Sequence, residues 1–125
     1  MKTFKFNIPL YDVDVLIVQI ESPEDKEEIK KICEEKNIDF TEEFEDAILR
    51  GAVNGGDTYR DLNNRNIVMF LYPFDDVKKR QNILCHEKRH IEDRVLSYFG
   101  VDDIESAALL AGFLGEKLFE FENIE

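Results

Sequence analysis

A helix-length stretch from Asp75 to Phe99 constrains the fold most, because proline precedes it and glycine follows it at Gly100. Proline two residues before the stretch cannot continue a helix, and glycine commonly ends one. An aspartate at 75 or 76 is a suitable N-cap. At 100° per residue, one apolar stripe forms along this helix, made of Leu84, Ile91, Val95 and Tyr98. The rest of the chain must therefore supply a core long enough to cover that stripe.

The same stretch contains HEKRH, an H-E-x-x-H motif that uses both histidines of the chain. Because His86 and His90 are four residues apart, their imidazoles leave one helix face a turn from each other. Such a pair can hold Zn²⁺ at about 2.0–2.1 Å, and Glu87 beside them can accept a proton from a water molecule that the metal activates. The motif predicts His86 and His90 as metal ligands and Glu87 as the catalytic residue. The alternative is an ordinary solvated helix face, since charged residues surround the motif.

Helical phase favours the metal site over the solvated face. Glu87 falls on the flank of the apolar stripe, beside Ile83, and the two histidines follow around the surface. A carboxylate at the margin of a core needs a partner or a chemical role, because burying an unpaired charge is costly. Glu87 is therefore expected to be more than a surface residue.

Composition indicates one soluble domain spanning residues 1–125. Two cysteines imply no disulfide framework, so a reducing compartment, the cytoplasm, is the expected location. The N-terminus lacks the apolar core of a signal peptide, and no apolar run approaches the roughly 20 residues that span a bilayer. A net charge of −12 argues against nucleic acid as a partner. The favoured explanation of this charge is an ordinary acidic surface that keeps the protein soluble, and the less favoured one is an acidic mimic of DNA.

The alternation of apolar and polar residues predicts an α+β fold built on a small mixed β-sheet. Strands are expected at residues 4–8, 12–20 and 67–72, and helices at residues 22–36, 41–49, 75–99 and 102–120. The strand at 12–20 is apolar enough to be buried on both faces. Residues 1–50 would form N-terminal strands and covering helices, and residues 51–125 a strand, the motif helix and a C-terminal helix.

The C-terminal helix is expected to be largely buried, because residues 107–114 are apolar nearly all round. Its small residues, Gly112 and Gly115 among them, would let a neighbouring helix approach closely. Between the covering helices and the strand at 67–72, the sequence Asn54-Gly55-Gly56 predicts a tight turn between short extended segments.

A zinc site needs a third protein ligand, and no third histidine exists. Glu105, fifteen residues after His90 and near the start of the last helix, is the leading candidate. With Asp102 as N-cap, however, Glu105 would instead complete a capping box. Both roles, metal ligand and helix cap, therefore remain open for Glu105. Asp102 and Asp103 are weaker ligand candidates.

With these motifs in place, the sequence resembles a minimal gluzincin, a zinc metallopeptidase domain, over roughly residues 51–119. The resemblance lies in a strand (IVMFLYPF), a helix with HEKRH, a short loop and a helix reading ESAALLAGFLGEKLF. It is particularly similar to small zincin-like proteins of phages and mobile elements. In that family an acid at the start of the second helix is the third metal ligand, and Glu105 is the matching position. Family members usually have uncharged residues where this chain has Lys88 and Arg89, and usually a longer loop before the third ligand.

The resemblance implies a zincin-like fold and a zinc-dependent metallopeptidase that hydrolyses a peptide or protein substrate. It also implies that the strand Ile67 to Tyr72 lines the cleft and pairs with an extended peptide. The alternative is a non-catalytic, acidic interaction or regulatory protein of a mobile element that retains a zincin-like scaffold. Nothing in the sequence indicates the cleavage specificity, the oxyanion-stabilising residue or the oligomeric state.

Overall fold

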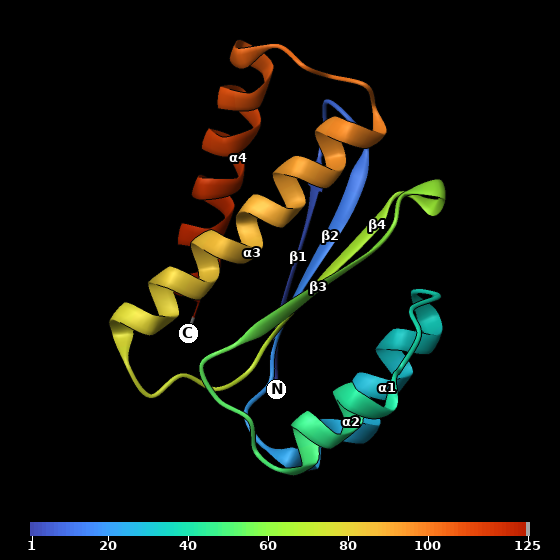
Figure 1. Cartoon of the computed structure of the whole chain (residues 1–125), viewed down its shortest axis with the longest axis vertical. Helices are drawn as coiled ribbons and strands as arrows, with labels where there is room; N and C mark the ends of the chain where they lie inside the picture. The colour runs from blue at the N-terminus through green and yellow to red at the C-terminus, as the bar shows by residue number, and fades with distance from the viewer. Residues whose placement is uncertain (125) are drawn as a thin grey trace.

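The computed structural model describes residues 1–124 and shows an α+β fold, a four-stranded mixed sheet with helices on both faces (Figure 1). The strands are β1 (Lys2–Ile8), β2 (Val13–Gln19), β3 (Gly56–Asp61) and β4 (Asn66–Leu71). The helices are α1 (Lys26–Glu35), α2 (Glu42–Leu49), α3 (Val77–Tyr98) and α4 (Ile104–Glu122), with short 3₁₀ turns at Pro23–Asp25 and Leu62–Asn64. Three strands and all four helices lie where the sequence predicts them.

The strand order is β1-β2-β4-β3, with β2 and β4 parallel and the two outer strands antiparallel to their neighbours. The two inner strands are the apolar ones, and β2 is buried on both faces as predicted. The strand at 67–72 was expected to pair with a peptide, and that expectation is wrong. As β4 it pairs with β2 on one side and β3 on the other, so its backbone has no free edge. The two edge strands are β1 and β3, and β3 is the edge strand next to β4.

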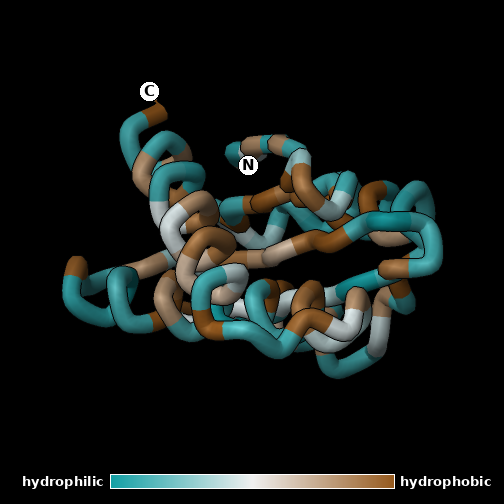
Figure 2. Tube along the Cα trace, turned by 90° about the horizontal axis from the view of Figure 1, so that it is seen from above, coloured by the Kyte–Doolittle hydropathy of each residue, from teal (hydrophilic) through white to brown (hydrophobic). Residues whose placement is uncertain are grey.

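Each face of the sheet carries its own core. Helices α3 and α4 cover one face, over side chains such as Ile17, Ile67 and Met69, and α1 and α2 cover the other, over Val18 and Phe70 (Figure 1). Aromatic rings of α4 pack on the edge strand β1, where the Phe6 and Phe113 ring centroids are 6.1 Å apart. In Figure 2 hydrophobic segments run along the strands between the layers, and the outer turns are hydrophilic. Helix α4 therefore sits over β1, while α3 crosses the opposite part of the sheet.

Side-chain caps begin three of the helices. The Asp76 carboxylate accepts hydrogen bonds from the first-turn amides of α3, and Thr41 caps α2, both as predicted. The last helix was expected to begin with Asp102 as its cap, and this is wrong by one residue. Asp103 is the N-cap and its carboxylate accepts from the Ser106 amide at 2.9 Å.

Helix α4 is not largely buried, contrary to the expectation from its composition. Four residues along one stripe are buried, but Ile104, Leu109 and Phe119 are exposed. The reason is that α4 packs on β1 and α3 only, and no further layer covers its outer face. No atom lies within 4 Å of a Cβ built at Gly112, so this glycine does not serve close helix packing. Within residues 1–124, no helix combines the length and apolar character needed to cross a membrane.

Candidate metal centre

The two histidines of the motif lie together on α3, with their Nε2 atoms 3.1 Å apart. Their rings are nearly perpendicular, and the His86 side chain is 62% exposed. Together with Glu87 they form a group whose donor atoms all lie within 4.8 Å of one another. The predicted residues of the motif are thus brought together on the surface of one helix.

The spacing of the two nitrogens fits a shared metal ion. Two nitrogens bound at about 2.0–2.1 Å in tetrahedral geometry lie roughly 3.3 Å apart, close to the 3.1 Å observed between Nε2 of His86 and Nε2 of His90. The same distance also suits a hydrogen bond from one neutral imidazole to the other. The distance is therefore compatible with a shared metal ion as well as with a hydrogen bond between the two rings.

Glu87 is held rigidly beside the histidines. Its residue is only 3% exposed, and the Thr58 hydroxyl donates a hydrogen bond of 2.7 Å to Oε1. The other oxygen, Oε2, lies 3.9 Å from Nε2 of His86. Gly56 makes this approach possible, because a Cβ there would lie 3.1 Å from Cγ of Glu87. One carboxylate oxygen is therefore fixed by the sheet while the other faces the histidines.

Lys88 and Arg89, the charged residues within the motif, are engaged away from the histidines. The Lys88 ammonium pairs with the buried Glu92 carboxylate, and Arg89 Nε pairs with Asp93 at 3.2 Å. Lys88 lies on the flank of α3 that faces α4, since its side chain is the nearest to Gly115 of α4. Neither cation is aimed at the two imidazoles, so neither opposes a metal ion by direct contact.

Glu105, the predicted third ligand, lies elsewhere. It is exposed in the first turn of α4, and it is not part of the group of metal-ligating atoms formed by His86, Glu87 and His90. Helix α4 packs on the flank of α3 that carries Lys88 and Glu92. By helical phase, the two histidines lie on the opposite flank of α3, across the core stripe. In this arrangement α4 would have to move for Glu105 to reach the two histidines.

The structure adds a part of the site that sequence reasoning missed, the edge strand β3. Tyr72 N–H donates to the Gly55 carbonyl at 2.9 Å, and hydrogen-bonding direction alternates along an antiparallel ladder. The backbone groups of Gly56, Thr58 and Arg60 therefore point away from β4 to the open edge. The side chains of Thr58 and Arg60 lie on the α3 face, where Thr58 bonds to Glu87 and Arg60 lines a pocket with Arg94. The expected tight turn at Asn54-Gly55-Gly56 was the nearest signal, and Gly56 in fact begins the strand.

Comparison with known proteins identifies no relative: no protein family, no curated protein and no solved structure matches this chain.

Proposed function

We propose that this protein is a zincin-like, zinc-dependent peptidase in which His86 and His90 bind the metal ion. The observation that carries the proposal is the pair of Nε2 atoms 3.1 Å apart, next to a buried carboxylate that Thr58 holds in place. Zinc held there supplies Lewis acidity and lowers the pKa of water. Glu87 is the general base, because its Oε2 faces the histidines while Oε1 is occupied by Thr58. The exposed thiol of Cys85 suits a reducing cytoplasm.

The third ligand is the open part of this proposal. Glu105 keeps the role that the gluzincin resemblance gives it only if the start of α4 moves around α3 on metal binding. Without that movement, the remaining coordination positions go to water and substrate, and zinc binds more weakly than in a site with three protein ligands. The affinity for zinc therefore reports directly on the third ligand.

The edge strand β3 offers a place for an extended substrate. Gly56, Thr58 and Arg60 present their N–H and C=O groups to the open side, where a polypeptide can add as a fifth strand. The histidines lie on the flank of α3 turned away from α4, which is the flank toward this edge. A segment paired with β3 would therefore pass beside the metal centre.

A second candidate function is a non-catalytic interaction protein, such as a regulatory protein of a mobile element, built on the same scaffold. The position of Glu105 on the far flank of α3 favours it, because two histidines without a third protein ligand make an incomplete catalytic site. The net charge of −12 would then favour a basic partner.

Metal analysis of protein prepared without a histidine tag or chelator tests the proposal. We expect close to one equivalent of Zn²⁺, lost in His86→Ala and in His90→Ala. Glu105→Gln should weaken zinc tenfold or more if Glu105 is a ligand, and should leave zinc affinity unchanged if α4 stays where it is. Failure of the wild type to bind zinc when it is supplied refutes the metal centre.

The same preparations separate the two functions. Wild type should cleave members of a peptide library, and Glu87→Gln should bind zinc yet cleave about 10²–10⁴-fold more slowly, because proton transfer is lost. A chelated sample is the control for contaminating activity. Zinc binding without cleavage, or cleavage that persists in Glu87→Gln, refutes the peptidase and favours the interaction protein.

A further inference from the structure

A second site lies on the opposite face of the sheet from the histidines. A cavity of about 440 Å³ opens between α2 and the start of β3. The residues that line it come from α2, from the loop that follows and from β3 and its neighbour, among them Glu43, Phe44, Arg50, Asp57, Tyr59 and Tyr72. Because β3 is the edge strand, this cavity adjoins the same open edge as the metal centre, from the other side.

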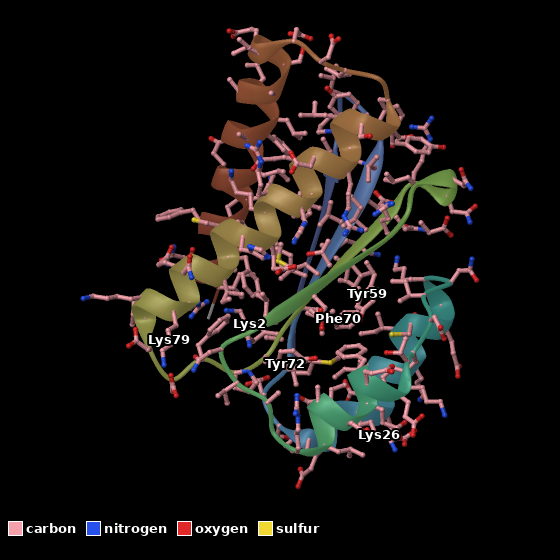
Figure 3. The ribbon with its side chains drawn as sticks, viewed as in Figure 1. Lys2, Lys26, Tyr59, Phe70, Tyr72 and Lys79 are labelled. Atoms are coloured by element: carbon pink, nitrogen blue, oxygen red, sulfur yellow. The ribbon has the colours of Figure 1, made fainter. Side chains whose placement is uncertain are left out.

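Aromatic rings form one wall of the cavity. The ring centroid of Phe44 lies 5.8 Å from that of Tyr59 and 6.3 Å from that of Tyr72. Figure 3 shows Tyr59 and Tyr72 in the layer between the sheet and the two helices α1 and α2. Ring faces attract cations, most strongly where water is partly excluded.

Asp57 supplies a negative charge on the same wall. Its Oδ2 accepts a hydrogen bond of 3.3 Å from the Tyr72 hydroxyl, and no lysine or arginine of residues 1–124 forms an ion pair with it. Burial raises the pKa of Asp57 above its usual value, against the opposing effect of the Tyr72 hydrogen bond. Glu43 and Arg50, the two exposed charges that line the cavity, offset each other. The three charged side chains of the lining therefore sum to one negative charge, and the partly buried Asp57 carboxylate forms no ion pair within residues 1–124.

We propose that this cavity binds the cationic side chain of a lysine or arginine in a polypeptide that pairs with β3. The proposal rests on the strand addition described under the proposed function. Side chains of a strand alternate between the faces of a sheet, and Asp57 and Tyr59 lie on the α2 face while Thr58 lies on the α3 face. In an added strand, every second side chain would therefore point to the cavity and its neighbours to the metal centre. The partner is thus selected for a basic residue by a site separate from the histidines.

The first experiment needs no variant and no metal. Protein kept in EDTA is titrated at about 150 mM salt with n-butylammonium, and then with n-butanol, while NMR follows the ring signals of Tyr59 and Tyr72. We expect these signals to shift with butylammonium and not with the neutral alcohol. Fluorescent peptides of alternating valine and threonine, with lysine or norleucine at one position, are then compared by anisotropy. The lysine peptide should bind at least tenfold more tightly, and equal affinities overturn the proposal in favour of an apolar pocket.

Two matched variants locate the charge. Asp57→Asn keeps an acceptor for the Tyr72 hydroxyl and removes the carboxylate, so the preference for lysine over norleucine should disappear. Asp61→Asn removes the same charge from the same strand outside the cavity and should leave that preference within twofold of wild type. Equal losses in both variants would mean general attraction to an acidic surface, and no loss in Asp57→Asn would mean that the carboxylate is not the binding group. Both results overturn the proposal.

The outcomes also distinguish this site from the metal centre. Lysine preference in metal-free protein that never binds zinc would refute the peptidase and leave the cavity intact. Zinc binding and cleavage without any preference for a basic residue would refute the cation site in the cavity and leave the peptidase intact. Shifts with butylammonium but no binding of either peptide would refute pairing with β3.

Discussion

Replacing Gly56 with alanine tests the close contact between β3 and Glu87, the general base of the proposed metal centre. A Cβ at this position would lie 3.0 Å from the Phe70 carbonyl oxygen, 3.1 Å from Cγ of Glu87 and 3.1 Å from Cδ2 of Leu71. Leu71 can adjust, but the Phe70 oxygen belongs to the backbone of the inner strand β4 and Glu87 is held by Thr58. Something in the sheet or in α3 must therefore shift.

The magnitude follows from two opposing effects. Overpacking of this kind costs about 1–3 kcal/mol, while removing a glycine from a strand contributes about 0.5–1 kcal/mol of stability. We expect Gly56→Ala to lower the free energy of unfolding by about 1–2 kcal/mol, and the melting temperature by roughly 3–8 °C. Urea unfolding followed by circular dichroism measures this change. An unchanged slope of the unfolding free energy against urea concentration shows that wild type and variant undergo the same unfolding transition.

Gly112→Ala is the matched control, because it makes the same chemical change in a helix with no atom within 4 Å of the new Cβ. It should stabilise the protein by about 0.5–1 kcal/mol, since glycine is a poor helix former. The two substitutions should thus act in opposite directions. Gly56→Ala as stable as wild type, with Gly112→Ala stabilising, would refute the close approach of β3 to α3.

Three further predictions concern buried polar groups. Thr58→Val should cost about 1–3 kcal/mol in urea unfolding, because it leaves a buried oxygen of Glu87 without its donor, and Thr58→Ser should restore most of the loss. Native protein should react with a thiol reagent at exposed Cys85 and not at Cys33, because Cys33 is buried and burial raises its pKa to about 11. Mass spectrometry should find Cys33 labelled only after unfolding. Fast labelling of Cys33 in the native state would contradict its burial. Stability should fall as the pH rises above about 9, because burial raises the pKa of Cys33 to about 11 and of Tyr59 to about 12, so that the folded state keeps protons which the unfolded state releases. Tyr59→Phe should flatten the decline of the urea midpoint between pH 10 and 12, and an unchanged slope there would contradict this.

The sequence predicted those parts of the fold that local patterns determine. The inner strands and the starts of α2 and α3 follow from apolar runs and from the caps Thr41 and Asp76, and the structure confirms them. The burial of Glu87 followed from helical phase alone, because its angle to the core stripe is fixed by its position on α3. The convergence of His86 and His90 followed from the same geometry.

Tertiary arrangement explains what the sequence did not predict. Strand β3, with the sequence GDTYRD, was expected only as a short extended segment after the Asn54-Gly55-Gly56 turn, because a polar edge strand lacks the alternation that identifies other strands. The apolar sequence of a helix such as α4 predicts burial whether or not a further layer covers the helix, so the exposure of Phe119 could not be inferred. The position of Glu105 depends on which flank of α3 receives α4, and nothing in the spacing of residues determines that choice.

The parallel pairing of β2 with β4 has a consequence for how the chain folds. Residues paired in this ladder, such as Asp14 and Asn66, are 52 positions apart (66 − 14), whereas β1 and β2 are joined by a short hairpin. Closing so long a loop reduces chain entropy before the central contacts repay it. We therefore expect the hairpin and the helices to form early and the central ladder to form in the rate-limiting step. Until that ladder closes, the apolar strand β4 can pair only with its neighbour in sequence, β3, and its other edge stays open, so this is the stage at which the chain is most exposed to aggregation.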